Sequence, residues 1–110
     1  TIVLEEDGTV VAFLMVEIHA YSKSATLITL DVQENFRRRG YAAQLLQRTE
    51  ALLQAKGIQK CILQVDVGNE AALSFYRTRG FEKVRTLPQY YANGNDAYLM
   101  VKRLPSSAQT

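Results

Sequence analysis

Apolar residues cluster in short stretches near the start of the chain, which predicts β-strands there. Residues 2–5 (IVLE) and 10–18 (VVAFLMVEI) are rich in β-branched and large apolar side chains. The segment EDGT at 6–9 between them has the composition of a tight turn. We therefore expect a β-hairpin over the first 18 residues.

A strict alternation follows in residues 25–32 (ATLITLDV), and it predicts a third strand with Ile28, Leu30 and Val32 on one face. Residues 60–65 (KCILQV) form a short, largely apolar run, as expected of a central strand covered on both faces. The pattern between these two strands is helical. A strand, a helix and a strand in this order predict a right-handed parallel crossover.

Two amphipathic helices are predicted. The first begins at Tyr41 and ends before Gly57, which is placed as a left-handed stop after Lys56. Asn69 is the expected cap of the second helix, and Gly80 is its expected stop. The expected inner stripes are Tyr41, Leu45, Leu46, Leu52 and Leu53 on the first helix, and Ala72, Phe75 and Tyr76 on the second.

Residues 81–87 and 97–104 have strand composition and are expected to close the sheet. The chain has 110 residues, of which 47% are hydrophobic. That size indicates one small domain over residues 1–104. Residues 105–110 form a polar tail. The order of elements predicts a mixed α/β fold.

Composition excludes several classes of protein. Thirteen basic and eleven acidic residues give a net charge of only +2, with mixed signs outside the run Arg37–Arg39, so we expect no nucleic-acid partner. Cys61 is the only cysteine and His19 the only histidine, which disfavours a disulfide framework or a structural zinc site. The single cysteine fits a reducing, cytoplasmic setting. No apolar run has the length of a membrane span, so we expect no membrane partner.

The segment QENFRRRGYAAQLL at 33–46 carries the main chemical signal. A strand that ends at Val32, a loop with arginine and glycine, and a helix that starts near Gly40 place unpaired backbone N–H groups at a positive helix end. Such a place binds phosphate. The segment is neither GxxxxGK[ST] nor GxGxxG, so nucleotide hydrolysis and dinucleotide binding are disfavoured.

This loop resembles the [QR]-x-x-G-x-[GA] cofactor loop of the GNAT superfamily of N-acetyltransferases. Arg37, Gly40 and Ala42 occupy its three defined positions, with Arg38, Arg39 and Tyr41 between them. A second family motif, N-x-x-A-x-x-F-Y-x-x-x-G-F, is matched by Asn69, Ala72, Phe75, Tyr76, Gly80 and Phe81. Residues 90–100 (YYANGNDAYLM) resemble the end of the protein N-terminal acetyltransferases, among them the ribosomal-protein alanine type.

The resemblance implies a GNAT-like fold, a mixed and mostly antiparallel sheet with a central parallel strand pair and flanking helices. The family's first strand and the two helices after it have no counterpart here. Acetyl-CoA would lie in a V-shaped opening between residues 25–32 and 60–65. Its pyrophosphate would meet the backbone of residues 38–42, with the arginines adding long-range attraction. Its pantetheine would pair with strand edge groups near Leu30 and Val32, and Asn69 is expected to contact it too.

The same resemblance assigns roles in acetyl transfer. Tyr76 matches the family's general acid, whereas its apolar helix stripe also fits a plain core residue. A backbone N–H near Val32 would bind the oxyanion. Tyr90 and Tyr91 would line the groove for a peptide backbone or pack at the sheet edge.

The family often has a glutamate base in a segment L-E-V, and this chain has Gln64 in that place. Gln64 cannot act as a base, but it can orient a water or a substrate amide. Deprotonation of the amine is therefore left to Glu17, Asp31, His19 or the solvent.

The leading interpretation is transfer of an acetyl group from acetyl-CoA to the N-terminus of a protein or peptide. A small-molecule amine is the first alternative acceptor. A catalytically silent acyl-CoA-binding domain is a second alternative, suggested by Gln64 and the absent acceptor helices. Nucleic-acid binding through residues 37–39 rests on the charge cluster alone, and it predicts a steep dependence on salt.

Overall fold

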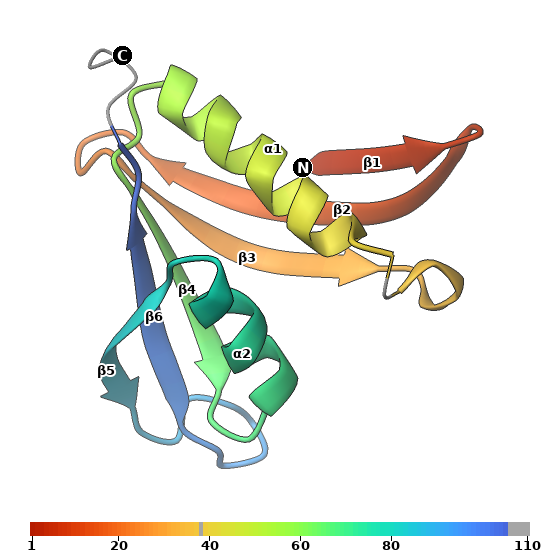
Figure 1. Ribbon diagram of the computed structural model, residues 1–110. Helices are drawn as coiled ribbons and strands as arrows, with labels where there is room; N and C mark the ends of the chain where they lie inside the picture. Colours follow the sequence, from red (N-terminus) through yellow and green to blue (C-terminus); the bar gives the residue numbers. More distant parts are fainter. Residues whose placement is uncertain (38, 106–110) are drawn as a thin grey trace.

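The structure is a computed structural model, and it describes residues 1–37 and 39–105. The strands and helices of Figure 1 follow the predicted order closely. Arg38 and most of the predicted polar tail (106–110) lie outside the described residues. The elements are β1 (Ile2–Glu6), β2 (Thr9–His19), β3 (Ser24–Val32), a short 3-10 helix (Glu34–Phe36), α1 (Tyr41–Ala55), β4 (Lys60–Asp66), α2 (Glu70–Thr78), β5 (Glu82–Leu87) and β6 (Ala97–Arg103).

The described strands form one six-stranded sheet in the order β1-β2-β3-β4-β6-β5. Only β3 and β4 are parallel, and the other neighbours are antiparallel. The predicted hairpin is present, and its turn uses Asp7 and Gly8, both at positive φ (52° and 80°), as in a type I′ turn. The expected mixed sheet with a central parallel pair is confirmed.

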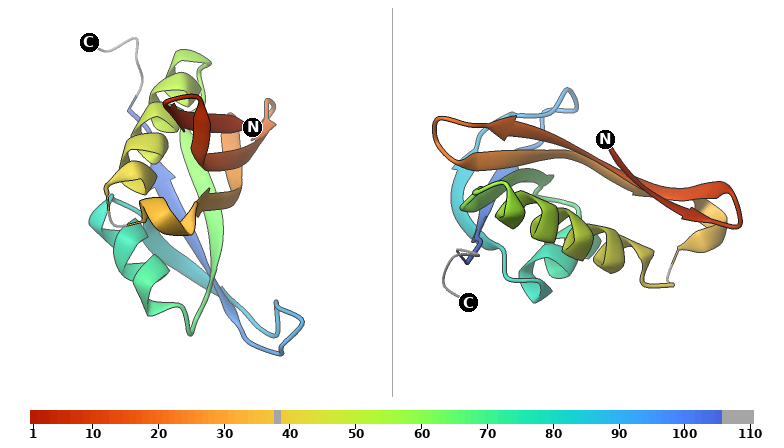
Figure 2. Two further views of the ribbon diagram at one scale, coloured as in Figure 1. Left: turned by 90° about the vertical axis from the view of Figure 1, so that its right-hand side faces the viewer. Right: turned by 90° about the horizontal axis from the view of Figure 1, so that it is seen from above.

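Both helices cover the same face of the sheet (Figures 1 and 2). Helix α1 connects β3 to β4. Helix α2 connects β4 to β5, and these two strands run in the same direction because both are antiparallel to β6. The connections from β3 to β4 and from β4 to β5 both move toward the β5 edge of the sheet. Because such connections are right-handed, both place their helix on the same face of the sheet. The termini of the two helices therefore lie close enough to enclose a groove over the sheet.

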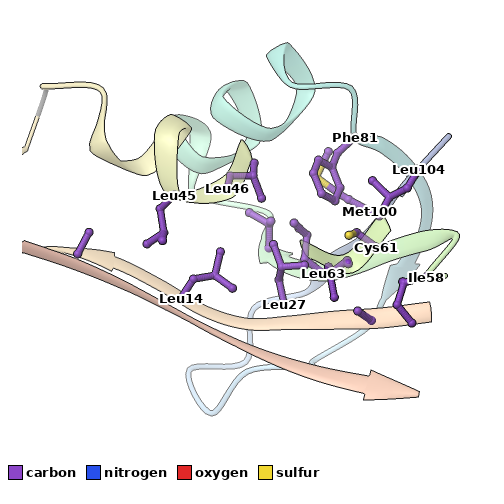
Figure 3. Close-up of a cluster of buried hydrophobic side chains, with 14 of the residues drawn as sticks. Leu14, Leu27, Leu45, Leu46, Ile58, Cys61, Leu63, Phe81, Met100 and Leu104 are labelled. Carbon is purple, nitrogen blue, oxygen red and sulfur yellow. The ribbon is translucent and has the colours of Figure 1, made fainter. Parts of the chain in front are cut away.

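One core lies between this face and the helices. Figure 3 shows Leu45 and Leu46 of α1 above Leu14, Leu27 and Leu63 of the strands. On β4 the buried residues alternate with half-buried ones. The expectation that β4 is covered on both faces is therefore wrong, since the described residues place helices on one face only.

The predicted stripe of α1 is correct except at one position. Leu45, Leu46 and Leu53 are buried, but Leu52 is 49% exposed and Thr49 is fully buried instead. Leu52 lies at the edge of the stripe, where the helix surface turns toward solvent. The hydroxyl of Thr49 donates to the carbonyl of Leu45 at 2.8 Å, so burial leaves no unpaired polar group.

A bulge interrupts the alternation of β3. Met15 pairs with Thr29 and Val16 pairs with Leu27, so Ile28 between them has no partner on β2. The extra residue shifts the phase, and Leu27 is buried while Ile28 is 50% exposed. The prediction that Ile28 shares a face with Leu30 and Val32 is therefore wrong, because a strict period of two assumes an unbroken ladder.

Candidate active site

The parallel strands β3 and β4 separate along their length. They pair only at Ser24–Lys60, Ala25–Cys61 and Thr26–Ile62, although β3 continues to Val32. Figure 1 shows the two strands diverging beyond this point. Beyond Thr26, β3 pairs with β2 alone and Ile28 pairs with neither neighbour, so within the described residues the backbone N–H and C=O groups on the other edge of this half lie outside the sheet ladder.

The N-terminus of α1 lies beside this open edge. Gly40 is its cap, in the left-handed region at φ 80°, and no side chain caps the first turn. That turn also contains no acidic residue. Its N–H groups keep their partial positive charge, as an anion site requires. A Cβ at Gly40 would meet no atom within 4 Å, so the space above the backbone is open.

Arg37 ties the loop to the end of β3. Its Nε donates to the carbonyl of Val32 at 3.0 Å, and its Nη2 lies 3.8 Å from Asp31 Oδ1. The guanidinium therefore remains at the mouth of the opening. Arg39 instead stacks over the ring of Phe36, with 5.2 Å from Cζ to the ring centroid.

A groove of about 610 Å³ runs between the start of α1 and α2 over the end of β3. It contains seven of the residues that sequence analysis assigned to the cofactor: Leu30, Val32, Arg37, Gly40, Tyr41, Ala42 and Asn69. Arg39 is not among its lining residues, and the structure does not describe Arg38. Another hollow, of about 510 Å³ near Glu50 and Lys102, shares Ala43 and Arg79 with the groove and contains no predicted site residue.

A smaller hollow of about 330 Å³ adjoins the groove and shares Leu30, Asn69 and Ala72 with it. It brings together Gln64, Tyr76 and Tyr91, which are far apart in the sequence and were all predicted to take part in the reaction or in acceptor binding. Its remaining residues are Val65 and Asp66. The groove and the hollow therefore meet at the point where β3 and β4 separate.

Tyr76 lies on the inner side of α2 and is mostly enclosed. Its ring makes edge-to-face contacts with Phe75 at 5.2 Å and Phe81 at 5.5 Å. Tyr76 lines the hollow. Its hydroxyl makes no hydrogen bond to any of the described residues, and it is not fully enclosed. Burial raises the pKa of Tyr76, and the hydroxyl therefore keeps its proton at neutral pH.

Asn69 has a clear structural role. Its Oδ1 accepts from the N–H of Ala72 at 3.1 Å, which caps α2 as predicted. Its own N–H donates to the carbonyl of Asp66 at 2.9 Å. The cap fixes the start of α2 against the end of β4, where the groove and the hollow meet.

Three of the expected residues lie away from this point. Glu17 and His19 pair with Thr26 and Ser24 at the opposite end of β3, and His19 Nε2 lies 3.0 Å from the hydroxyl of Thr26. Tyr90 is 51% exposed and packs edge-on against Tyr91 at 5.0 Å, so Tyr91 alone of the pair lines the hollow. Of the three candidate side-chain bases, only Asp31 borders the groove.

Several residues of the groove and of the hollow were not predicted from the sequence. Arg79 lies over the ring of Phe75, with 3.9 Å from Cζ to the centroid, and its Nη1 donates to the Phe75 carbonyl at 3.0 Å. Arg79 is thus a second cationic side chain in the lining of the groove, in addition to Arg37. The spacing of Phe75 and Arg79, four residues apart, was visible in the sequence. Phe36 and Asp66 carried no local signal, because only tertiary packing brings them to the site.

An open edge between two parallel strands beside a bare helix N-terminus is the arrangement of an α/β domain that binds an anionic ligand at its strand ends. A family model described as the acetyltransferase (GNAT) family matches residues 1–81. The chain therefore belongs to the GNAT family of acetyltransferases.

Relatives of known sequence agree with this assignment. An N-alpha-acetyltransferase of Sulfurisphaera tokodaii is 34% identical over 113 residues, covering 93% of this chain and 68% of the relative. N-alpha-acetyltransferase 30 of Schizosaccharomyces pombe is 38% identical over 69 residues, covering 63% of this chain and 46% of the relative. This chain thus spans between about half and two thirds of these relatives.

Solved structures show the same fold. The ribosomal-protein-S18-alanine N-acetyltransferase of Escherichia coli superposes with a TM-score of 0.86 at 26% identity, over 96% of this chain and 68% of that one. Ard1 of Thermoplasma volcanium superposes with a TM-score of 0.84 at 30% identity, over 91% and 67% of the two chains.

Proposed function

We propose that this protein is an acetyl-CoA-dependent N-alpha-acetyltransferase that acts on the N-termini of proteins or peptides. The junction of the groove and the hollow carries the proposal, because the groove offers an extended site for an anionic ligand and the hollow gives a second ligand access to the same point. The relatives named N-alpha-acetyltransferases, at 34% and 38% identity, support the class of acceptor.

The lining of the groove fits an acyl-CoA. The open space over Gly40 and the bare first turn of α1 suit a pyrophosphate, and Arg37 and Arg79 supply positive charge nearby. The unpaired edge of β3 near Leu30 and Val32 suits the amide groups of pantetheine, which would extend the sheet by one strand-like segment. Phosphate and thioester ends are thereby directed to α1 and to the hollow, respectively.

The chemistry requires three steps at the hollow. The amine nitrogen forms a bond to the thioester carbonyl carbon, the C–S bond breaks, and the sulfur leaves as a thiolate. A backbone N–H of the free β3 edge near Val32 stabilises the oxyanion. The Tyr76 hydroxyl donates its proton to the thiolate, and its raised pKa keeps that proton available at neutral pH. The proton that the nitrogen releases as the amide forms passes through solvent to the Tyr76 oxygen, which restores the acid.

The acceptor ammonium must first lose a proton. Gln64 lines the hollow but cannot take it, and Glu17 and His19 lie at the far end of β3. Deprotonation is therefore assigned to solvent or to Asp31, with Gln64 orienting the amine or a water. Asp31 is the weaker choice because it pairs with Arg37.

The experiment is acetyl transfer by the parent chain and by Tyr76→Phe, on a peptide panel and a panel of small amines. The substitution keeps the ring packed against Phe75 and Phe81, so folding is retained. Turnover should fall by roughly 10²-fold or more with little change in acetyl-CoA affinity. If Tyr76→Phe turns over at the rate of the parent chain, Tyr76 is not the general acid. If the parent chain acetylates small amines and no peptide, the proposal of a peptide acceptor is wrong.

A second candidate function is favoured by one observation: Gln64, which cannot act as a base, lines the hollow where a base would be needed. It is binding of acyl-CoA without transfer. Calorimetry distinguishes it, because a silent domain binds acetyl-CoA while every amine in both panels remains unmodified.

A further inference from the structure

We propose that Asp66 is a positioning residue that acts through Asn95 to fix Tyr91 in the wall of the hollow, on the side where the acceptor binds. This inference rests on the proposed function. It concerns the loop 88–96 between β5 and β6, which sequence analysis associated with the acceptor only through its two tyrosines.

The carboxylate of Asp66 holds this loop directly. Asn95 Nδ2 lies 3.1 Å from Oδ1 and 3.2 Å from Oδ2, so one amide group donates to the whole carboxylate. The N–H of Gly68 donates to Oδ1 at 2.8 Å, which fixes the orientation of the carboxylate itself. Hydrogen bonds to an ionised acceptor are stronger than neutral ones. Asp66 and Asn95 therefore form a clip between the end of β4 and the loop.

The backbone of Asn95 connects the clip to Tyr91 through a hydrogen bond. The carbonyl of Asn95 accepts from the N–H of Tyr91 at 3.2 Å, and the carbonyl of Tyr91 accepts from the N–H of Gly94 at 2.9 Å. Asp66, Asn95 and Tyr91 are thus joined by consecutive hydrogen bonds. Both Asp66 and Tyr91 line the hollow together with Gln64 and Tyr76.

Two further bonds close the rest of the loop but do not reach Tyr91. Asp96 Oδ1 accepts from the N–H of Gln89, which has a positive φ of 49°, at 2.9 Å. The carbonyl of Asp96 accepts from the N–H of Val67 at 3.1 Å. The base of the loop is therefore anchored without the clip, and loss of the clip should release the tip while β5 and β6 stay paired.

The charge on Asp66 is maintained over the working range of pH. The N–H of Gly68, followed by the side chain of Asn95, lowers the pKa of Asp66 below its usual value. The same charge, after burial and the neighbouring Tyr90, contributes to raising the pKa of Tyr91. The Tyr91 hydroxyl therefore keeps its proton at neutral pH.

The test uses three variants of the chain. In Asp66→Asn the oxygen that accepts from Gly68 and Asn95 becomes a neutral amide oxygen, and the NH₂ that replaces Oδ2 cannot accept from Asn95, so the clip keeps one neutral hydrogen bond. In Asn95→Asp two carboxylates face each other. The double variant Asp66→Asn/Asn95→Asp restores one donor and one acceptor across the clip, with the polarity exchanged. Glu82→Gln, at an exposed carboxylate on β5, is the control for loss of one negative charge.

Two measurements are made on each variant: amide hydrogen exchange over residues 88–96, and KM for a peptide acceptor and for acetyl-CoA separately. Each single variant should speed exchange at Tyr91 and Gly94 and raise the acceptor KM by about 3- to 10-fold, with the acetyl-CoA KM unchanged. In the double variant, both the exchange rates and the acceptor KM should return most of the way to the parent values. Glu82→Gln should change neither quantity.

Unchanged exchange in the single variants would overturn the clip. Faster exchange with an unchanged acceptor KM would leave the clip in place but overturn its role in the reaction. If the parent chain acetylates no amine at all, the proposed function fails and the positioning role fails with it, whereas the exchange data still decide whether the clip exists.

Discussion

Replacing Gly40 by alanine separates the strain of the backbone from the binding of the ligand, because the chain contains a matched control. Gly40 and Gly57 have nearly the same φ, 80° and 81°, and an added Cβ meets no atom within 4 Å at either position. They lie beyond opposite ends of the 15-residue helix α1, which is itself about 22 Å long. Only Gly40 borders the groove.

The expected loss of stability is the same for both variants. A left-handed backbone costs an L-residue about 1–2 kcal/mol, and the lower entropy of the unfolded alanine chain offsets about 0.4–1 kcal/mol of this. Each variant should therefore lose about 1 kcal/mol of unfolding free energy. For a domain of this size that corresponds to a fall in Tm of about 4–8 °C.

The affinity for acetyl-CoA should differ sharply between them. At Gly40 the methyl group occupies the space over the helix N-terminus, and relief of the strain turns the adjacent N–H groups away. Loss of one hydrogen bond to a charged phosphate costs about 1.5–3 kcal/mol, so Kd should rise about 10- to 100-fold. Gly57→Ala should bind as the parent does.

Urea unfolding and calorimetric titration with acetyl-CoA measure the two effects independently. If Gly40→Ala binds acetyl-CoA with the parent affinity, the ligand does not use this helix end and the assignment of the groove is wrong. An equal loss of affinity in both variants would attribute the effect to stability rather than to contact with the ligand.

Two other predictions concern the core beside the groove. Lys102→Met should lower the unfolding free energy measured in urea by about 1–2 kcal/mol. The reason is that the Glu50 carboxylate, which lies 2.7 Å from Lys102 Nζ and is only 14% exposed, would lose its partner. Adding Glu50→Gln should recover part of the loss, and an unchanged urea midpoint in Lys102→Met would refute the pairing. Burial raises the pKa of the Cys61 thiol to about 12, so native protein at pH 8 should resist alkylation. Because the unfolded thiol ionises near pH 9 and the folded one does not, stability should fall as the pH rises above about 9, and an increase there would contradict the burial.

Most of the fold could be predicted from local patterns. Turn residues at positive φ, such as Gly8, Gly57 and Gly80, mark the ends of elements, and the change from a period of two to a helical period separates strands from helices. The errors arise where a tertiary contact overrides the pattern. Leu52 is apolar at helical spacing, but it is half exposed at the edge of the stripe, and Thr49 is enclosed instead.

The site residues also fall into those that a local pattern predicts and those that only the tertiary structure places. Residues contributed by one loop and one helix start, such as Arg37, Gly40 and Ala42, were found because their motif is contiguous. Glu17 and His19 were considered as bases because sequence gives no distance along a strand pair, and the register of β2 and β3 places them far from the groove. The roles of individual site residues remain predictions that the variants above address.

The bulge at Ile28 connects the least predictable part of the fold with the proposed chemistry. Pairing with β4 ends at Thr26, and the register shift on the opposite edge falls two residues later. A bulge bends a strand and increases its twist, so β3 turns away from β4 where the groove begins. Ile28 lies between the paired half of β3, which anchors the core through Ala25 and Leu27, and the open half, which faces the ligand. The bulge therefore lies where the core-forming half of β3 gives way to the edge that the proposed function requires.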